Sequence, residues 1–84
     1  MNAKLVRALA TEHSSETIAD AIEGIIEREE DILGISEEDL AELLTNLMLA
    51  SRVRAAVDDG SSLKDAFRAE MAKVRKVVQN TPTD

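Results

Sequence analysis

The chain offers little for nucleophilic or acid–base catalysis. It has no cysteine, and its single histidine, His13, lies beside Ser14 and Ser15 in a connector. A catalytic triad requires a buried base that a third group orients, and a histidine in a serine-rich connector is more typical of a solvated neighbour of a helix cap. The three glycines are isolated, so no glycine-rich loop can cradle a phosphate. We expect a protein that is not an enzyme, with no cofactor and no small-molecule substrate.

The best candidate for a cation site is a row of carboxylates, Glu23, Glu27 and Glu30, at i, i+4 and i+7. Hard cations prefer oxygen ligands, and this spacing places three of them on one side of a helix. Carboxylate metal sites in helical bundles also use a Glu-x-x-His motif, however, and the chain has no helical one. A solvated helix face accounts for the same residues, so we expect no bound metal.

Acidic residues gather toward the C-terminal end of the same stretch. There the helix dipole disfavours negative charge by about 0.3–1 kcal/mol for each group. A basic surface of the same or another protein could offset that cost. The acidic candidates for binding a partner are Asp20, Glu23, Glu27, Glu30 and Asp31.

Basic residues form a complementary row near the C-terminus. At about 100° per residue, Lys64, Arg68 and Arg75 project within about 40° of one another around a helix axis. Charges that border an apolar seam resemble the e and g positions of a coiled coil, which select a partner and its orientation. With Lys76 they could instead contact phosphates, although the chain lacks aromatic residues on which bases stack.

Charge and composition narrow the classes further. The 84 residues carry a net charge of −7, but residues 1–51 contain three bases against twelve acids and residues 52–84 seven bases against five acids. An acidic chain is repelled by phosphates unless its bases share one face, which disfavours nucleic acid as the partner. Without cysteine there is neither a disulfide framework nor a thiolate zinc site.

No stretch of the sequence resembles a membrane span. The longest uncharged run, Leu43 to Ser51, is far shorter than the roughly 20 apolar residues that cross a bilayer. The N-terminal residues also lack the apolar core of a signal peptide. We therefore expect a cytoplasmic protein with no membrane contact.

Glycine, serine and proline residues separate four stretches with helical periodicity, and none alternates like a strand. The predicted helices span about 2–12, 16–33, 37–58 and 63–79, followed by a polar tail, 80–84, in a single domain, 1–84. Short connections force neighbouring helices to run antiparallel. The sequence predicts an all-α fold, a small antiparallel helical bundle of three main helices to which the short N-terminal helix is an addition.

Capping residues and apolar stripes support these boundaries. The capping residues are Ser14 or Ser15 before and Gly34 after the second helix, Ser36 with Asp39 at the start of the third, and Ser62 with Asp65 at the start of the fourth. The predicted buried stripe of the third helix consists of Leu40, Leu43, Leu44, Leu47 and Met48, with Ala50, Val53 and Val57 on its edge.

Two charged residues interrupt the apolar faces. Glu29 falls in the apolar sector of the second helix, and Arg54 in that of the third. In a hairpin that turns near Gly60, Arg54 comes close enough to Glu70 for a partly exposed ion pair, which stabilises little. Glu29 could face Arg54 or a base of the fourth helix in a second subunit, across a two-fold interface.

The apolar surface is large for a core of this size. The fourth helix is apolar over nearly half its circumference and carries the only aromatic residue, Phe67, with Met71 one turn later. We expect both, with Glu29 and Arg54, in the interface of a homodimer. The sequence predicts a non-enzymatic regulator or adaptor that binds another protein through helix faces of a dimeric bundle. The alternative is a nucleic-acid-associated protein, which contacts phosphates through the basic row or mimics nucleic acid through the acidic residues.

Overall fold

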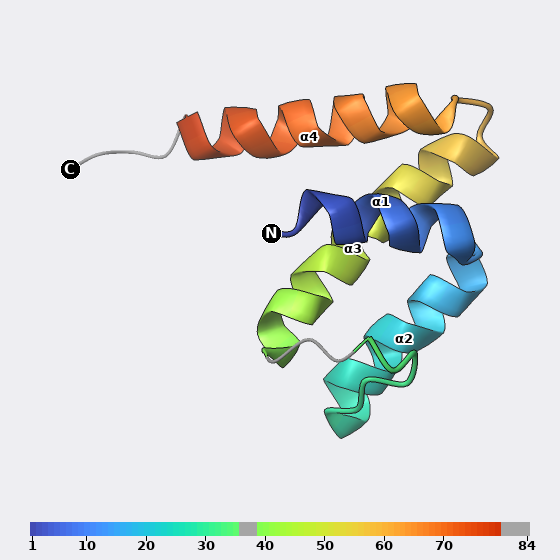
Figure 1. The fold of residues 1–84 in the computed structure, drawn as a ribbon, viewed down its shortest axis with the longest axis vertical. Helices are drawn as coiled ribbons and strands as arrows, with labels where there is room; N and C mark the ends of the chain where they lie inside the picture. Colours follow the sequence, from blue (N-terminus) through green and yellow to red (C-terminus); the bar gives the residue numbers. More distant parts are fainter. Residues whose placement is uncertain (36–38, 80–84) are drawn as a thin grey trace.

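Four helices make up the part of the chain that the structure, a computed structural model, describes: residues 1–35 and 39–79 (Figure 1). They are α1 (Ala3–Glu12), α2 (Ser15–Arg28), α3 (Leu40–Asp58) and α4 (Leu63–Gln79). These two ranges contain no strand. The predicted all-α bundle, with three longer helices and a short N-terminal one, is confirmed.

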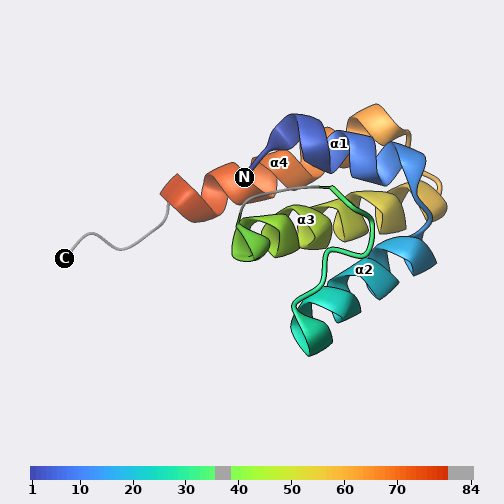
Figure 2. The same ribbon diagram turned by 60° about the horizontal axis from the view of Figure 1, so that its bottom comes forward.

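Helix α3 lies at the centre, because each of the other three helices packs against it. Figure 2 shows α1 and α4 above α3 and α2 below it. The largest fully buried side chains are Ile18, Leu43, Leu47, Val6, Val53 and Asn46. Burying an aliphatic side chain of this size contributes about 1.5–3 kcal/mol, so α3 and its contacts with α1 and α2 supply most of the core.

Helix α1 is part of this core rather than an addition to it. Val6, Leu9 and Ala10 are buried, and α1 packs on α3. The side chain of Asn2 caps its first turn, and the backbone N–H of Asn2 donates to Asn46 Oδ1 on α3 at 2.9 Å. The sequence showed an amphipathic helix here, but not which helix covers it.

The buried face of α3 differs from the predicted stripe. Leu43 and Leu47 are buried as predicted, but Met48 is 43% exposed, whereas Asn46 and Leu49 are buried. An apolar stripe predicts one covered side. Because α1, α2 and α4 all cover α3, its buried arc is wider and extends further around the axis than the stripe.

Helix α2 ends at Arg28, well before the predicted end at residue 33. Glu29 adopts a left-handed conformation (φ 54°), and the backbone N–H of Glu30 donates to the carbonyl of Gly24 at 3.2 Å. The chain then folds back over α2, and Ile32 Cγ2 would lie only 3.1 Å from a Cβ at position 24, so glycine provides the room there. Glu29 is consequently an exposed cap residue and not part of an apolar face.

The remaining boundaries follow from caps. Ser14 and Ser62 cap α2 and α4 as predicted, and each side-chain oxygen accepts the backbone N–H three residues later at 3.1 Å. The predicted cap of the third helix, Ser36, lies outside the described residues. Asp39 is the N-cap there and has extended backbone, so α3 begins at Leu40 and not at residue 37.

Candidate functional site

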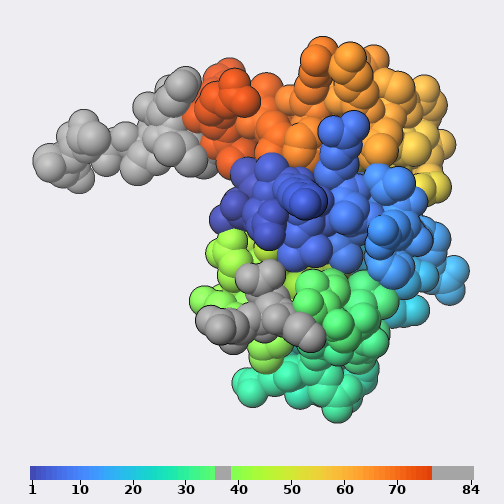
Figure 3. Space-filling view, in the orientation of Figure 1, coloured from blue at the N-terminus to red at the C-terminus, as the bar shows by residue number. Residues whose placement is uncertain are grey.

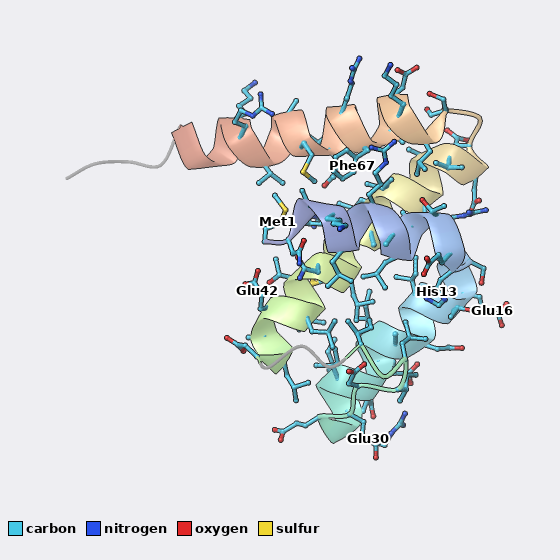
Figure 4. The ribbon with its side chains drawn as sticks, in the orientation of Figure 1. Met1, His13, Glu16, Glu30, Glu42 and Phe67 are labelled. Carbon is cyan, nitrogen blue, oxygen red and sulfur yellow. The ribbon has the colours of Figure 1, made fainter. Side chains whose placement is uncertain are left out.

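An apolar groove lies between the start of α1 and the middle of α4. It has a volume of about 450 Å³ and is lined by Met1, Ala3, Phe67, Met71, Val74 and Arg75. Met1 and Phe67 face the space between the two helices in Figure 4, and Figure 3 shows α1 and α4 side by side on this face. An adjoining hollow of about 390 Å³ shares Phe67, Met71 and Arg75 and adds Arg68 and Ala72. We call the two together the α1–α4 groove.

The groove exists because the apolar face of α4 is wider than the core can cover. Ala66 and Glu70 are buried, whereas Phe67, Met71 and Val74 are only half-buried. The half-buried residues lie at i, i+4 and i+7 and therefore follow one line along the helix. One edge of the face completes the core, and the other edge forms the floor of the groove.

Basic side chains border the groove from both helices. Arg68 and Arg75 line it from α4, and the Arg7 guanidinium of α1 lies 6.0 Å from the centre of the Phe67 ring. Lys64 is exposed one turn before Arg68. Among the described residues, none of these four bases has a carboxylate partner. An anionic group at the groove would therefore meet cations that no carboxylate of the described part of the chain neutralises.

The structure thus unites two sets of residues that the sequence suggested separately. Arg68 and Arg75 came from the basic row, and Phe67 and Met71 from the expected dimer interface; all four line the groove. Sequence reasoning missed the α1 side of the groove, including Arg7. No sequence signal identifies it, because a helical pattern does not show which helices become neighbours.

Polar contacts with α3 hold the α1 side in place. The amino group of Met1 pairs with Glu42, and the backbone N–H of Asn2 donates to Asn46 Oδ1. Asn46 is fully buried, and its Nδ2 has no hydrogen-bond partner among the described residues. A buried donor without a partner costs about 1–3 kcal/mol. Asn46 therefore positions the start of α1 at a cost in stability; its only sequence signal was a polar residue inside the longest uncharged run.

The acidic candidates lie on a different surface. Asp20, Glu23 and Glu27 are exposed on α2, and Glu30 and Asp31 follow in the connector, where a 3.2 Å ion pair joins Glu30 to the last residue of α2. The early end of α2 takes Glu30 out of the predicted row of three carboxylates. Within residues 1–35 and 39–79, no group of three or more metal-binding side chains is arranged to hold an ion.

The predicted ion pair between Arg54 and Glu70 does not form. Glu70 is buried, and its carboxylate lies 3.5 Å from Arg52 Nη1 and 3.9 Å from Lys73 Nζ. The α3–α4 connection therefore places Arg52, and not Arg54, opposite Glu70. Arg52 reaches this carboxylate from α3, whereas Lys73 contacts it from one turn later on α4 itself.

Arg54 and Asp58 together instead join the ends of α1 and α3 to the start of α2. The Arg54 Nε lies 3.0 Å from Asp58 Oδ1, and its Nη1 donates to the carbonyl of Ala10 at the end of α1 at 3.4 Å. Ser15 Oγ, at the start of α2, donates to Asp58 Oδ2 at 2.6 Å. The Ser15 hydrogen bond, with a smaller effect from Arg54, lowers the pKa of Asp58 from 3.8.

A larger but shallower hollow of about 610 Å³ lies over this junction, lined by Ser15, Ala55, Ala56, Asp58 and Asp59. Its central carboxylate, Asp58, is already bonded to Ser15 and Arg54. His13 ends α1 next to it, away from the groove (Figure 4). The junction is therefore structural, and the α1–α4 groove is the better candidate for binding.

Comparisons with known proteins give a family without an activity. The sequence profile of a family of unknown function (DUF6952) matches residues 1–79. No curated protein and no solved structure matches the chain. None of the described helices combines the length and the apolar character needed to cross a membrane.

Proposed function

The chain belongs to the family of unknown function DUF6952, and from its own surface we propose a small, non-enzymatic regulator or adaptor that binds another protein through the α1–α4 groove. The observation that carries the proposal is a half-buried apolar row beside bases that have no carboxylate partner within residues 1–35 and 39–79. The proposal includes a dimeric state and a cytoplasmic location. The cytoplasm is reducing, and a domain without cysteine needs no disulfide to be stable there.

The partner that fits the groove is an amphipathic helix with acidic flanks. Phe67, Met71 and Val74 present anchors at i, i+4 and i+7, the spacing that helix-in-groove recognition uses. A methionine side chain adapts to differently shaped apolar partners. Arg68 and Arg75 would bond carboxylates at the edge of the bound helix and so fix its orientation.

A nucleic-acid partner has weaker support. Lys64, Arg68 and Arg75 form an exposed basic row that could contact phosphates. The floor beside them is aliphatic apart from Phe67, however, and the Arg7 guanidinium lies over that ring. A base would therefore have a single aromatic ring on which to stack, and Arg7 already lies over one side of it. A second form of this alternative is that the acidic residues of α2 mimic nucleic acid and occupy the basic groove of another protein.

The test is binding of a designed acidic peptide. A fluorescein-labelled helical peptide with leucines at i, i+4 and i+7 and flanking glutamates is titrated with the protein, and anisotropy is recorded. We expect saturable binding that weakens by about tenfold or more in the double variant Arg68→Glu, Arg75→Glu. Lys76→Glu is the matched control, because Lys76 is exposed on the same helix but lines neither hollow.

Two results would overturn the proposal. One is peptide affinity that the double variant leaves unchanged. The other is tighter binding of a labelled single-stranded oligonucleotide, lost at high salt, which would favour the phosphate-binding alternative.

A further inference from the structure

The outer face of α2 carries a second apolar row that the fold covers only in part. Ile26 is 65% exposed, Ile22 is half-buried and Ala19 is exposed. At about 100° per residue these three positions lie within about 60° of one another. Ile26 lies in the last turn of α2, and together the three residues form a contiguous apolar strip of the kind that marks a binding surface.

An acidic row borders this apolar row on one side. Its members are Glu16, Asp20, Glu23 and Glu27, all exposed, and they lie about 60–120° around the helix from Ile26. The outer face of α2 is therefore itself an acidic amphipathic helix. It has the chemistry that the α1–α4 groove selects.

The two surfaces also match in spacing. The groove anchors Phe67, Met71 and Val74 advance by four and then three residues, and Ile26, Ile22 and Ala19 have the same steps in the reverse direction. In that antiparallel register each acid is offset from a base by about two residues, which is about 3 Å along the helix axis. Glu27 comes level with the stretch between Lys64 and Arg68, Glu23 lies near Arg68, and Glu16 lies near Arg75.

The direction is fixed by where the charged rows lie. On both helices the charged row lies on the same rotational side of the apolar row when viewed from the N-terminus. When two such helices pack face to face, only an antiparallel arrangement brings the two charged rows to the same side. A parallel arrangement would leave acids and bases on opposite sides of the contact.

The groove and α2 of one molecule cannot meet. Figures 1 and 3 show α4 and α2 at opposite ends of the longest axis, with α1 between them. An α2 face that enters the groove therefore has to come from another molecule.

We propose that a second copy of this chain covers the α1–α4 groove with the outer face of its α2, antiparallel to α4. Each copy presents both surfaces, and in a two-fold pair the contact would be made twice. The consequence for regulation rests on the proposed function: a partner helix and self-association compete for one groove, so free copies hold the groove closed until a partner displaces α2.

Charge exchange provides the direct test. Variant A carries Glu23→Lys and Glu27→Lys, and variant B carries Arg68→Glu and Arg75→Glu; all four positions are exposed. Sedimentation is followed by interference, because the chain has no Trp or Tyr. We expect wild type to self-associate, A and B each to be monomeric with wild-type circular dichroism, and an equimolar mixture of A and B to associate again. Lys76→Glu should leave association unchanged.

Several outcomes would overturn the proposal. These are a monomeric wild type at millimolar concentration, a variant A that associates like wild type, or a mixture of A and B that stays monomeric. A loss of association in Lys76→Glu equal to that in B would show non-specific charge attraction instead.

A third variant separates this proposal from the proposed function. Ile26→Glu removes the most exposed large apolar side chain of the α2 row without touching the groove or adding a base. We expect it to be monomeric and to bind the acidic peptide more tightly than wild type at concentrations where wild type is associated. Monomeric Ile26→Glu that fails to bind the peptide would overturn the proposed function alone. A monomeric wild type that binds the peptide would overturn self-association, and with it the proposed dimeric state, but would leave partner binding through the groove standing.

Discussion

The two ends of α1 are attached to α3 in different ways. At its start, a buried side chain on α3, Asn46, accepts one backbone hydrogen bond from Asn2 and leaves its own Nδ2 without a partner. At its end, the half-exposed Arg54 donates to the carbonyl of Ala10 and pairs with Asp58. The buried attachment adjoins the groove, whereas the exposed one lies away from it. We therefore expect the first attachment to shape the binding surface and the second to stabilise the fold without affecting binding.

The largest effect is expected from Asn46→Ala, which breaks the buried attachment. The variant leaves a cavity and removes the acceptor for the Asn2 N–H, but it also removes the buried Nδ2 that has no partner, so the free energy of unfolding should fall by a net of about 1–2 kcal/mol. Urea unfolding followed by circular dichroism at 222 nm measures it. Thr45→Ala, on the exposed neighbour, is the control. Peptide binding should weaken as well, and unchanged affinity would contradict a role of Asn46 in shaping the groove.

Arg54→Ala breaks the exposed attachment and should cost less. Because the Arg54 side chain is 29% exposed and its partner Asp58 is 45% exposed, we expect a loss of about 1 kcal/mol, reduced at high salt. Arg54→Lys can keep the ion pair and should restore part of the loss. Peptide affinity should not change. If peptide affinity fell as much in Arg54→Ala as in Asn46→Ala, the two ends of α1 would not differ in their effect on binding.

Glu29→Gly should change the stability of the fold at a site away from both ends of α1, at the C-terminal cap of α2. A non-glycine residue in the left-handed region is strained, so glycine should raise the free energy of unfolding by up to about 1 kcal/mol. Combined with Asn46→Ala, it should recover stability but not peptide affinity. Recovered affinity would show that binding follows global stability. Glu29→Ala keeps the strain and should give no gain.

The smallest effect concerns pH and the exposed junction. The hydrogen bond from Ser15 and the charge of Arg54 lower the pKa of Asp58 in the folded state from 3.8. A lowered folded pKa stabilises the fold above the unfolded value, and this contribution is lost as pH falls through the folded value. The difference in urea midpoint between wild type and Asp58→Asn should therefore shrink below about pH 4. A difference that stays constant to pH 2 would contradict this.

Helix boundaries that depend on local hydrogen bonds could be predicted from the sequence, whereas boundaries that depend on side-chain packing after the helix could not. Ser14 and Ser62 cap their helices as predicted, because a cap depends only on residues a few positions away. The end of α2 depends on Ile32 folding back over Gly24, so the apolar periodicity alone extended the helix too far. The predicted pairing of Arg54 failed for a related reason: the register of a hairpin shifts with the shape of its connection.

The sequence by itself determined the all-α class, the start of α2, both ends of α4 and the segregation of acids from bases. These are properties of spacing and composition along one helix. Only the tertiary structure decided which faces become buried, because α3 has three neighbours and so buries Asn46 and Leu49 while Met48 is exposed. It also decided that α1 lies beside α4 and turns Phe67 and Met71 from an apolar stripe into a groove. Periodicity shows which residues can be buried, but the choice of neighbours arises from packing between distant segments.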